Sequence, residues 1–240
     1  MPFTYEYPHP SVTVDCIIFA LQDDELKVLL IQRNGNPYKG CWALPGGFVE
    51  IDESIETAAL RELNEETGVE KVFLEQLYTF GEPKRDPRER VISVAYYSLV
   101  KLGEHAIRAG SDALKACWFS TRKLPKLAFD HATILGIAIK RLQGKVVYAP
   151  IIFELLPAKF KLPQLQKVYE LILERPLDKR NFRKKILGAG IVTPLNEFDT
   201  TEPGRPAKLY KFDKQKFKKM QEHGYAFEIK PDSPRKKRSV

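Results

Sequence analysis

The residues best suited to chemistry lie in one segment, 47–69, which reads GFVEIDESIETAALRELNEETGV. Residues 54–67 favour a helix, because they include good helix formers and neither Pro nor Gly. On that helix Glu62, Glu65 and Glu66 fall at i, i+3 and i+4 and form one acidic face. Like charges this close are destabilising unless something neutralises them, and Mg²⁺ takes carboxylate oxygens and shares itself with phosphates. The spacing therefore predicts a divalent-metal site that works on a phosphate-containing ligand.

The same helix must be held against a core for its acidic face to stay in place. Ile55, Ala59 and Leu63 recur at i, i+4 and i+8 and predict one apolar stripe. Just upstream, the run WALPGG leads into the segment, and its paired glycines, Gly46 and Gly47, permit backbone shapes that other residues avoid. We count both glycines among the candidate substrate-binding residues.

The pattern G-x5-E-x7-R-E-L-x-E-E-x-G-V resembles the Nudix box at every specified position. The Nudix hydrolases cleave nucleoside diphosphates linked to some other moiety, and the resemblance implies an α/β/α sandwich that holds the box as loop, helix and loop. It also implies that Glu62, Glu65 and Glu66, with Glu53 as a further candidate, bind Mg²⁺ or Mn²⁺. Arg61 matches the family arginine that orients a glutamate. Glu65, Glu66 and Arg61 are the candidate catalytic residues.

A basic loop at residues 81–90, GEPKRDPRER, is a second candidate for ligand contact. Its arginines Arg85 and Arg88 could grip substrate phosphates or a terminal ribose, and the alternative is a solvated surface loop. The residues do not identify the general base. A box glutamate, Glu82 and Asp86 all remain candidates for that base.

The charge of the chain is divided unevenly along its 240 residues. Residues 1–150 hold 18 Lys and Arg against 20 Asp and Glu, whereas residues 151–240 hold 21 against 11. This asymmetry suggests a polyanionic partner for the second part, most often nucleic acid. A run of four basic residues at 235–238 contributes to the excess and is expected to be a solvated end that adds phosphate attraction.

Several classes of protein are disfavoured by composition. No run of about 18 apolar residues occurs, so we expect no membrane span. The N-terminus lacks a basic region followed by an apolar core and does not resemble a secretory signal. The three cysteines are odd in number and show no C-x-x-C spacing, which disfavours a zinc site or a disulfide framework and fits a cytoplasmic location.

The first 148 residues carry mixed strand and helix patterns that suit an α/β domain. Strands are expected at residues 11–20, 27–33, 71–80, 91–100 and 116–119. A helix is expected from about residue 129 to residue 142, with Asp130 as its cap.

The second domain, residues 149–240, begins with a proline-containing linker and then predicts two helices. The first covers residues 164–174, and Asp178 caps a basic amphipathic second helix with apolar positions at Phe182, Ile186 and Leu187. Residues 191–193 and 207–212 read as a two-stranded wing. Helix, tight turn, basic helix and β-ribbon together predict a winged helix-turn-helix.

The basic helix and the wing supply the candidate DNA contacts. Positive residues can neutralise phosphates, and Arg or Asn can read base edges in the major groove. The alternative is a solvated basic face on a domain for substrate recognition or dimerisation. The candidates are Lys179, Arg180, Asn181, Arg183, Lys184, Arg205 and Lys208.

Nearly the whole chain resembles the Nudix-related transcriptional regulators of bacterial NAD metabolism and sugar use. The resemblance is carried by the runs at residues 79–81 (TFG), 85–88 (RDPR), 127–131 (LAFDH), 155–157 (LLP) and 178–183 (DKRNFR). It implies a repressor that senses ADP-ribose or a related metabolite and grips a palindromic operator as a homodimer. Many members of that family have a degraded box. The box here is intact, so hydrolysis remains an expected activity.

These observations favour an ADP-ribose-responsive DNA-binding regulator that retains Mg²⁺-dependent ADP-ribose pyrophosphatase capacity. Two alternatives remain. One is a plain Nudix hydrolase whose basic domain serves dimerisation or substrate binding. The other is a catalytically silent sensor and repressor of a sugar operon.

Overall fold

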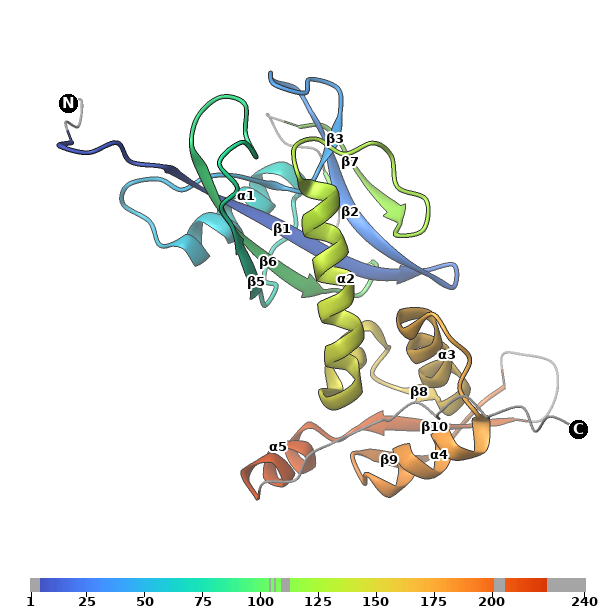
Figure 1. Ribbon diagram of the computed structural model, residues 1–240. Coiled ribbons are helices and arrows are strands. Elements are labelled where there is room, and N and C mark those ends of the chain that lie inside the picture. The colour runs from blue at the N-terminus through green and yellow to red at the C-terminus, as the bar shows by residue number, and fades with distance from the viewer. Residues whose placement is uncertain (1–4, 104, 106, 109–112, 201–205, 224–240) are drawn as a thin grey trace, which may run out of the picture. The chain divides into compact units, whose positions relative to one another are not determined.

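The computed structural model describes residues 5–103, 105, 107–108, 113–200 and 206–223. The chain divides into two compact units, Met1–Arg141 and Leu142–Val240 (Figure 1). Each unit has its own sheet and its own buried residues.

The helix α2, His131–Tyr148, contains the division between the units. It continues six residues beyond the expected end at residue 142, because Gly144 is tolerated within it and Pro150 is the first residue after it that cannot continue a helix. Neither α2 nor any other helix among the described residues is long and apolar enough to cross a membrane.

The first unit is built on a mixed sheet with strand order β3-β2-β1-β6-β5, to which β4 and β7 add by pairing with β1 and β2. At its centre β1 and β6 run parallel, with residues 11–19 opposite residues 91–99. The strands are β1 (Ser11–Gln22), β2 (Glu25–Arg33), β3 (Trp42–Ala43), β4 (Gly46–Phe48), β5 (Glu75–Phe80), β6 (Val91–Leu99) and β7 (Ala113–Ser120).

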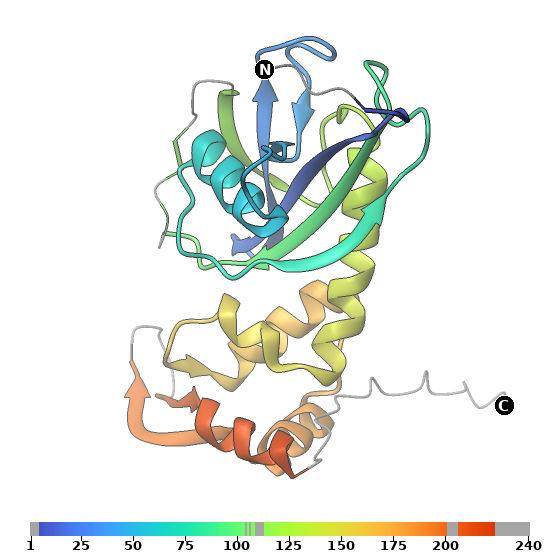
Figure 2. The ribbon, with the colours of Figure 1, turned by 90° about the vertical axis from the view of Figure 1, so that its left-hand side faces the viewer.

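Two helices cover the sheet from opposite sides, as Figures 1 and 2 show for α1 (Ile55–Thr67) and the first turns of α2. The expected α/β/α sandwich is confirmed. Helix α1 begins where the Ser54 side chain accepts a hydrogen bond from the backbone N–H of Thr57. It ends at Gly68, whose φ of 73° is the left-handed conformation that glycine adopts at low cost.

The apolar stripe on α1 packs against the centre of the sheet. Ala59 and Leu63 are 0% exposed and lie in one cluster with Val14, Ile18 and Val94 from β1 and β6. The expected stripe is therefore confirmed, and it fixes which way α1 turns its acidic face. Glu62, Glu65 and Glu66 cannot rotate away without exposing this core.

The second unit is a winged helix, as expected from the sequence. Its three-stranded sheet has the order β8-β10-β9. The two strands expected for the wing are β9 and β10, and β8 is an additional strand that pairs with β10. A final helix follows the wing and was not predicted, because it is short and mostly basic, with only Phe217 and Met220 as apolar positions one turn apart. The elements are η1 (Pro150–Leu155), β8 (Phe160–Lys161), α3 (Leu162–Leu173), α4 (Lys179–Gly188), β9 (Val192–Asp199), β10 (Ala207–Phe212) and α5 (Lys214–Glu222).

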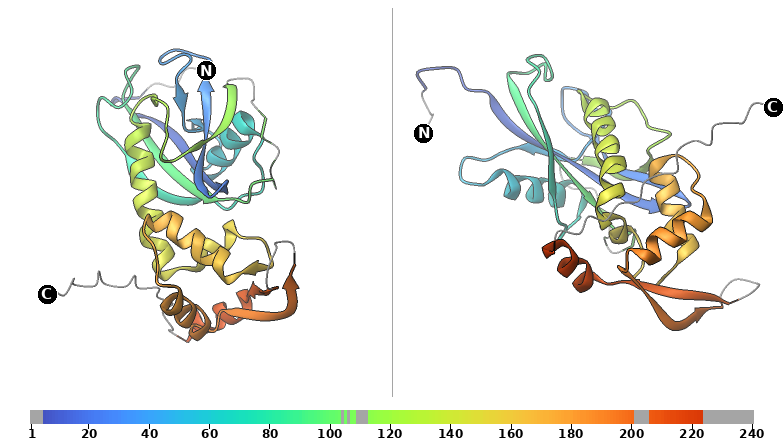
Figure 3. Two further views of the ribbon diagram at one scale, coloured as in Figure 1. Left: turned by 90° about the vertical axis from the view of Figure 1, so that its right-hand side faces the viewer. Right: turned by 60° about the horizontal axis from the view of Figure 1, so that its bottom comes forward.

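Side-chain hydrogen bonds set the turn between α3 and α4. Glu170 Oε1 accepts from the backbone N–H of Leu177 at 2.8 Å, and Gln166 Nε2 donates to the Leu177 carbonyl at 3.0 Å. Asp178 then caps α4 by accepting from the N–H groups of Arg180 and Asn181, as expected. These contacts fasten the start of α4 to α3, and Figure 3 shows the ribbon of the unit that contains both helices.

The buried face of α4 packs on α3 in the core of the second unit. Phe182 and Ile186 are buried, and the Phe182 ring meets Tyr169 edge-on at 5.5 Å between centroids. Leu187, the third apolar position of the helix, is 43% exposed because it falls one position past the buried stripe. The basic residues of α4 consequently face away from this core.

The packing of α1 yields a stability prediction. Leu63→Ala should lower the free energy of unfolding by about 2–5 kcal/mol, because it removes a fully buried side chain from a packed cluster. Urea denaturation followed by circular dichroism measures the change. Leu60 on the same helix is 42% exposed, so Leu60→Ala should shift stability by less than about 1 kcal/mol. Equal losses in the two variants would contradict this account of the core.

Candidate functional site

A pocket of about 660 Å³ opens in the first unit, where Gly47 and Phe48 at the start of the Nudix box meet α1. Its volume is in the range of small-molecule sites. One wall is acidic and is formed by Glu62, Glu65 and Glu66 of α1. Basic residues also line the pocket, among them Arg33, Arg85 and Arg88, and Phe48 and Phe129 add aromatic surface.

Arg61 is the counter-charge of the acidic wall. Its Nη1 donates to Glu62 Oε1 at 2.9 Å and to Glu65 Oε2 at 3.1 Å. Its Nε and Nη2 donate to the two oxygens of Glu53 at 3.1 and 2.6 Å, and Nη2 also donates to the Phe48 carbonyl. These carboxylates raise the pKa of Arg61, with the Glu53 hydrogen bonds as the main cause. Arg61 thus orients glutamates, in agreement with the role implied by the resemblance.

Two glycines bring the backbone directly against the glutamates. The N–H of Gly46 donates to Glu66 Oε2 at 2.8 Å. Gly46 has a φ of +155°, and a Cβ there would lie 2.0 Å from the Val14 carbonyl oxygen. A Cβ on Gly47 would lie 2.3 Å from Glu62 Oε1. Only glycine allows this approach, and both residues line the pocket.

The acidic wall fits a divalent cation in the chemistry of its donors. Glu62, Glu65 and Glu66 present carboxylate oxygens to one pocket, which hard cations prefer. Among the described residues, however, no three His, Cys, Asp or Glu side chains are gathered in a metal-ligating group. Glu62 and Glu65 turn toward Arg61 instead, and burial raises the pKa of the Glu62 carboxyl although Arg61 opposes the rise. A bound cation would have to share these two carboxylates with Arg61.

The structure separates Glu53 from the other predicted metal ligands. Both of its oxygens accept from Arg61, and Oε1 also accepts from the backbone N–H of Glu50. These hydrogen bonds, chiefly the one from Arg61, lower the pKa of Glu53. Glu53 is not among the pocket-lining residues. Its contacts show that it holds Arg61 in place together with Glu62 and Glu65, and its role as a further metal ligand stays a prediction.

Two arginines lie over one aromatic ring at the basic side of the pocket. The guanidinium carbons of Arg33 and Arg88 lie 4.8 and 5.7 Å from the centroid of Phe129. Arg88 is anchored by a bidentate ion pair with Asp86 at 2.7 Å. Burial, and then repulsion from Arg88, lowers the pKa of Arg33. Two guanidiniums that repel each other form a favourable place for an anion.

The sequence did not identify Arg33 as a pocket residue. It is the last residue of β2, and the sequence at the end of a strand does not show which surface a side chain faces. Asp86, one of the open candidates for general base, does line the pocket, and its hydrogen bonds from Arg88 outweigh burial and lower its pKa. Glu82 is not among the lining residues. A low pKa makes Asp86 a weak proton acceptor, so its contacts favour anchoring Arg88.

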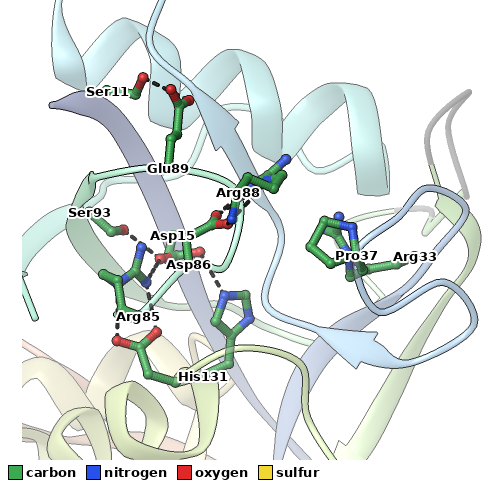
Figure 4. Close-up of polar contacts among 11 residues, drawn as sticks. Ser11, Asp15, Arg33, Pro37, Arg85, Asp86, Arg88, Glu89, Ser93 and His131 are labelled. Atoms are coloured by element: carbon green, nitrogen blue, oxygen red, sulfur yellow. Dashed lines mark hydrogen bonds and ion pairs between the residues drawn. The ribbon is translucent and has the colours of Figure 1, made fainter. Parts of the chain in front are cut away.

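Arg85 lines the pocket but is committed to other carboxylates (Figure 4). Its side chain is 4% exposed. Nε and Nη2 donate to both oxygens of Asp130 at 3.0 and 2.7 Å, and Nη2 also contacts Asp15 Oδ2 at 3.3 Å. The Ser93 hydroxyl donates to the same Asp15 oxygen. Arg85 was expected to grip substrate phosphates or to lie in a solvated loop; it lines the pocket, but it is buried and paired with carboxylates of the protein.

His131, the first residue of α2, completes this cluster. Its Nδ1 accepts a hydrogen bond from the backbone N–H of Leu44 at 2.9 Å. An accepting Nδ1 carries no proton, so the ring is neutral and its Nε2–H points to Asp15 Oδ1 at 3.3 Å. Burial lowers the pKa of His131, and the nearby Asp15 opposes that effect. The contacts indicate a structural histidine.

The candidate DNA contacts that the structure describes lie on the exposed surface of the second unit. Five of them belong to α4, and Lys208 lies on the wing strand β10. Arg205 lies outside the described residues. The side chains of Lys179, Arg180, Asn181, Arg183, Lys184 and Lys208 are all exposed.

Comparison with known proteins agrees with this architecture. Residues 9–136 match the NUDIX domain, and residues 152–212 match the NrtR DNA-binding winged helix domain. The chain belongs to the NUDIX family. This NUDIX chain is 37% identical over 216 residues to the "ADPR responsive transcriptional repressor NtrR" of Acinetobacter baylyi, which covers 88% of this chain and 86% of that protein.

Two further relatives resemble the NUDIX chain in different ways. The ADP-ribose pyrophosphatase of Methanocaldococcus jannaschii is 48% identical over 129 residues, covering 54% of this chain and 73% of that protein. The crystal structure of Shewanella oneidensis NrtR complexed with a 27mer DNA superposes with a TM-score of 0.75 at 35% identity, and covers 91% of this chain and 99% of that one. The NUDIX chain thus shares both units with a DNA-bound protein.

The environment of His131 predicts a pH dependence of stability. A histidine whose pKa is lowered by folding costs stability as the pH falls below its unfolded value of about 6.5. Asp15, Asp130, Arg85 and Arg33 are the charged groups around it. We therefore expect the Tm to decrease as the pH is lowered from about 7.5 to about 5.5. The decrease should be smaller in His131→Asn. Differential scanning fluorimetry measures both.

The exposed His9 offers a matched control. His9→Asn should retain the pH dependence of the unchanged protein. An acid-induced drop in Tm of the same size in His131→Asn would contradict the assignment.

Proposed function

We propose that the protein is an ADP-ribose-responsive DNA-binding transcriptional regulator with a Mg²⁺-dependent Nudix hydrolase site. One observation carries the proposal. A pocket with an acidic wall and a basic wall occurs in a chain that also has a winged helix with an exposed basic face. The names of the relatives from A. baylyi and M. jannaschii supply the ligand, ADP-ribose.

The basic wall suits the phosphate oxygens of a metal-bound diphosphate, and the acidic wall suits its metal ion. Arg33 and Arg88 offer guanidinium donors for phosphate oxygens, and the ring of Phe129 offers a flat apolar surface beside them. Glu62, Glu65 and Glu66 would hold Mg²⁺, or Mn²⁺ in its place. Bound there, the cation would offset negative charge and polarise a phosphoryl oxygen. Gly46 and Gly47 let the backbone approach Glu66 and Glu62 closely at this wall, and so help to set where the diphosphate would meet the cation.

Hydrolysis of ADP-ribose breaks the bond between one phosphorus and the bridging oxygen. Water adds to that phosphorus, and the products are AMP and ribose 5-phosphate. Arg61 keeps Glu62 and Glu65 in a fixed orientation before the cation binds. Preorganised charges of this kind contribute to catalysis because they need not be rearranged during the reaction.

The second unit would grip operator DNA. Helix α4 would enter the major groove, with Arg180, Asn181 and Arg183 near base edges and Lys179 and Lys184 at phosphates. Arg205 and Lys208 of the wing region would add backbone contacts. The regulator would act in the cytoplasm as a homodimer, because twofold symmetry pairs naturally with an inverted-repeat site.

The hydrolase assignment predicts the behaviour of Glu65→Gln/Glu66→Gln. Steady-state cleavage of ADP-ribose with Mg²⁺ should fall by at least about 100-fold, because two of the three carboxylates that would hold the cation lose their charge. Glu70, which lies just past α1 and outside the lining residues, gives the control Glu70→Gln, and its activity should be unchanged.

The outcome also separates the candidate functions. Full activity in the double variant would defeat the metal assignment. No cleavage by the unchanged protein, together with thermal stabilisation by ADP-ribose, would favour a catalytically silent sensor. The hold of Arg61 on two of the glutamates is the observation in favour of that second function.

The DNA assignment predicts a change in salt dependence. Binding of a duplex from upstream of the protein's own gene should weaken about tenfold or more in Arg183→Ala/Lys184→Ala at physiological salt. The slope of log affinity against log salt should become shallower by about one for each lost phosphate contact. Fluorescence anisotropy over a salt series measures both quantities.

Lys115 of β7 is an exposed lysine of the first unit and supplies the matched control. Lys115→Ala should leave affinity and slope unchanged. A salt-insensitive affinity, or equal losses in both variants, would leave a plain hydrolase with a basic accessory domain.

A further inference from the structure

Two sequence motifs meet in the structure, and the proposed function uses only Arg88 and Phe129 of them. They are residues 85–88 and residues 127–131, and the ion pair between Arg85 and Asp130 joins them (Figure 4). The pair is bidentate, with both Asp130 oxygens accepting from one guanidinium at 2.7 and 3.0 Å. Such fork-shaped pairs are stronger and more directional than single contacts.

Asp130 stands between the pocket and α2. Phe129 and His131 line the pocket, but Asp130 is not among the lining residues, and its side chain is 23% exposed. Phe129 has a φ of +49°, a left-handed conformation that costs energy in a residue with a side chain. Strain of this kind persists only where surrounding contacts enforce it.

Those contacts fasten the start of α2 to the pocket walls. The N–H of Ala128 donates to the Trp42 carbonyl at 2.8 Å, and the N–H of Leu44 donates to His131 Nδ1. Both partners belong to the segment that leads into Gly46. His131 also reaches Asp15 on the central strand β1. A displacement of the pocket lining therefore acts on the first turn of α2.

Helix α2 is continuous from the pocket into the second unit. Its residues up to Arg141 belong to the first unit, and those from Leu142 onward belong to the second. A continuous helix is a rigid element, so a shift of its first turn can be carried along its axis. The second unit contains α4 with its exposed basic residues.

We propose that the Arg85–Asp130 ion pair couples occupancy of the pocket to α2 and thereby sets the affinity for DNA. This inference rests on the proposed function and names its regulation. Arg85 lines the pocket, so an anionic diphosphate attracts its guanidinium. Its single contact to Asp15 at 3.3 Å is weaker than its fork to Asp130. When a diphosphate binds, Arg85 loses its contact with Asp15 first. It keeps its pair with Asp130 and draws Asp130, with the first turn of α2, toward the ligand.

The variant Asp130→Asn tests the coupling, because asparagine keeps the shape but loses the charge and one acceptor oxygen. Operator affinity is measured by anisotropy with and without ADP-ribose, and ADP-ribose affinity by calorimetry. In the unchanged protein, saturating ADP-ribose should lower operator affinity by at least about fivefold, a usual size for coupled sites. In Asp130→Asn both separate affinities should stay within about threefold, while the ligand effect falls below about twofold.

Linkage requires that operator DNA weaken ADP-ribose binding by the same factor, and this reciprocal effect should also vanish in Asp130→Asn. The matched control is Glu25→Gln, which breaks the Glu25–Lys27 pair of the first unit outside the pocket and should leave the coupling intact. A ligand effect of normal size in Asp130→Asn would overturn the proposal.

A second measurement uses the unchanged protein and does not depend on how the variant folds. Hydrogen exchange followed by mass spectrometry should show that ADP-ribose alters the protection of residues 128–135, at the start of α2. Unaltered exchange there, in a protein that binds ADP-ribose and responds to it, would overturn the coupling and leave the proposed function standing. A protein that does not bind ADP-ribose at all would overturn both.

Discussion

The pocket depends on the ion pairs that Arg61 makes with carboxylates of its own neighbourhood. Glu62 and Glu65 lie one turn apart on α1, and their charges would repel each other without a cation between them. Arg61 supplies that cation and is itself held by Glu53. The packing of α1 leaves no other face for these side chains. Local charge balance and core packing therefore specify the same orientation.

A second charge cluster follows the same principle in a more buried setting. Asp15 and Asp130 share the guanidinium of Arg85, and the neutral ring of His131 adds a hydrogen-bond donor without adding charge. Buried charges are tolerated only when they are paired and hydrogen-bonded, which is the case here. Because this cluster borders the pocket and stands at the start of α2, its arrangement connects the ligand site with the rest of the chain.

The second unit separates packing from charge on a single helix. Phe182 and Ile186 of α4 are buried against α3, while Arg183 and Lys184 are exposed between them in sequence. Hydrogen bonds from Glu170 and Gln166 hold the turn that sets the position of α4. The basic residues of α4 thus lie on the exposed surface of a packed helix, which suits recognition of a polyanion.

Much of this protein was determined by local sequence. The spacing of the box glutamates, the caps Ser54 and Asp178, and the apolar stripe of α1 each follow from helix periodicity and backbone hydrogen bonding, which act within a few residues. The same local rules predicted the winged helix. They failed for α5, whose nine residues offer only Phe217 and Met220 as an apolar pair.

Tertiary structure decided which charges meet. Nothing in the sequence indicates that Arg33 and Arg88 lie over Phe129, or that Arg85 pairs with Asp130, 45 residues away, in place of a ligand. Ion pairs are made between whatever groups the fold brings within a few ångströms, and their strength depends on burial. Sequence periodicity contains neither the distance nor the burial, so it identified the acidic wall of the pocket and left the partners of the basic wall to the fold.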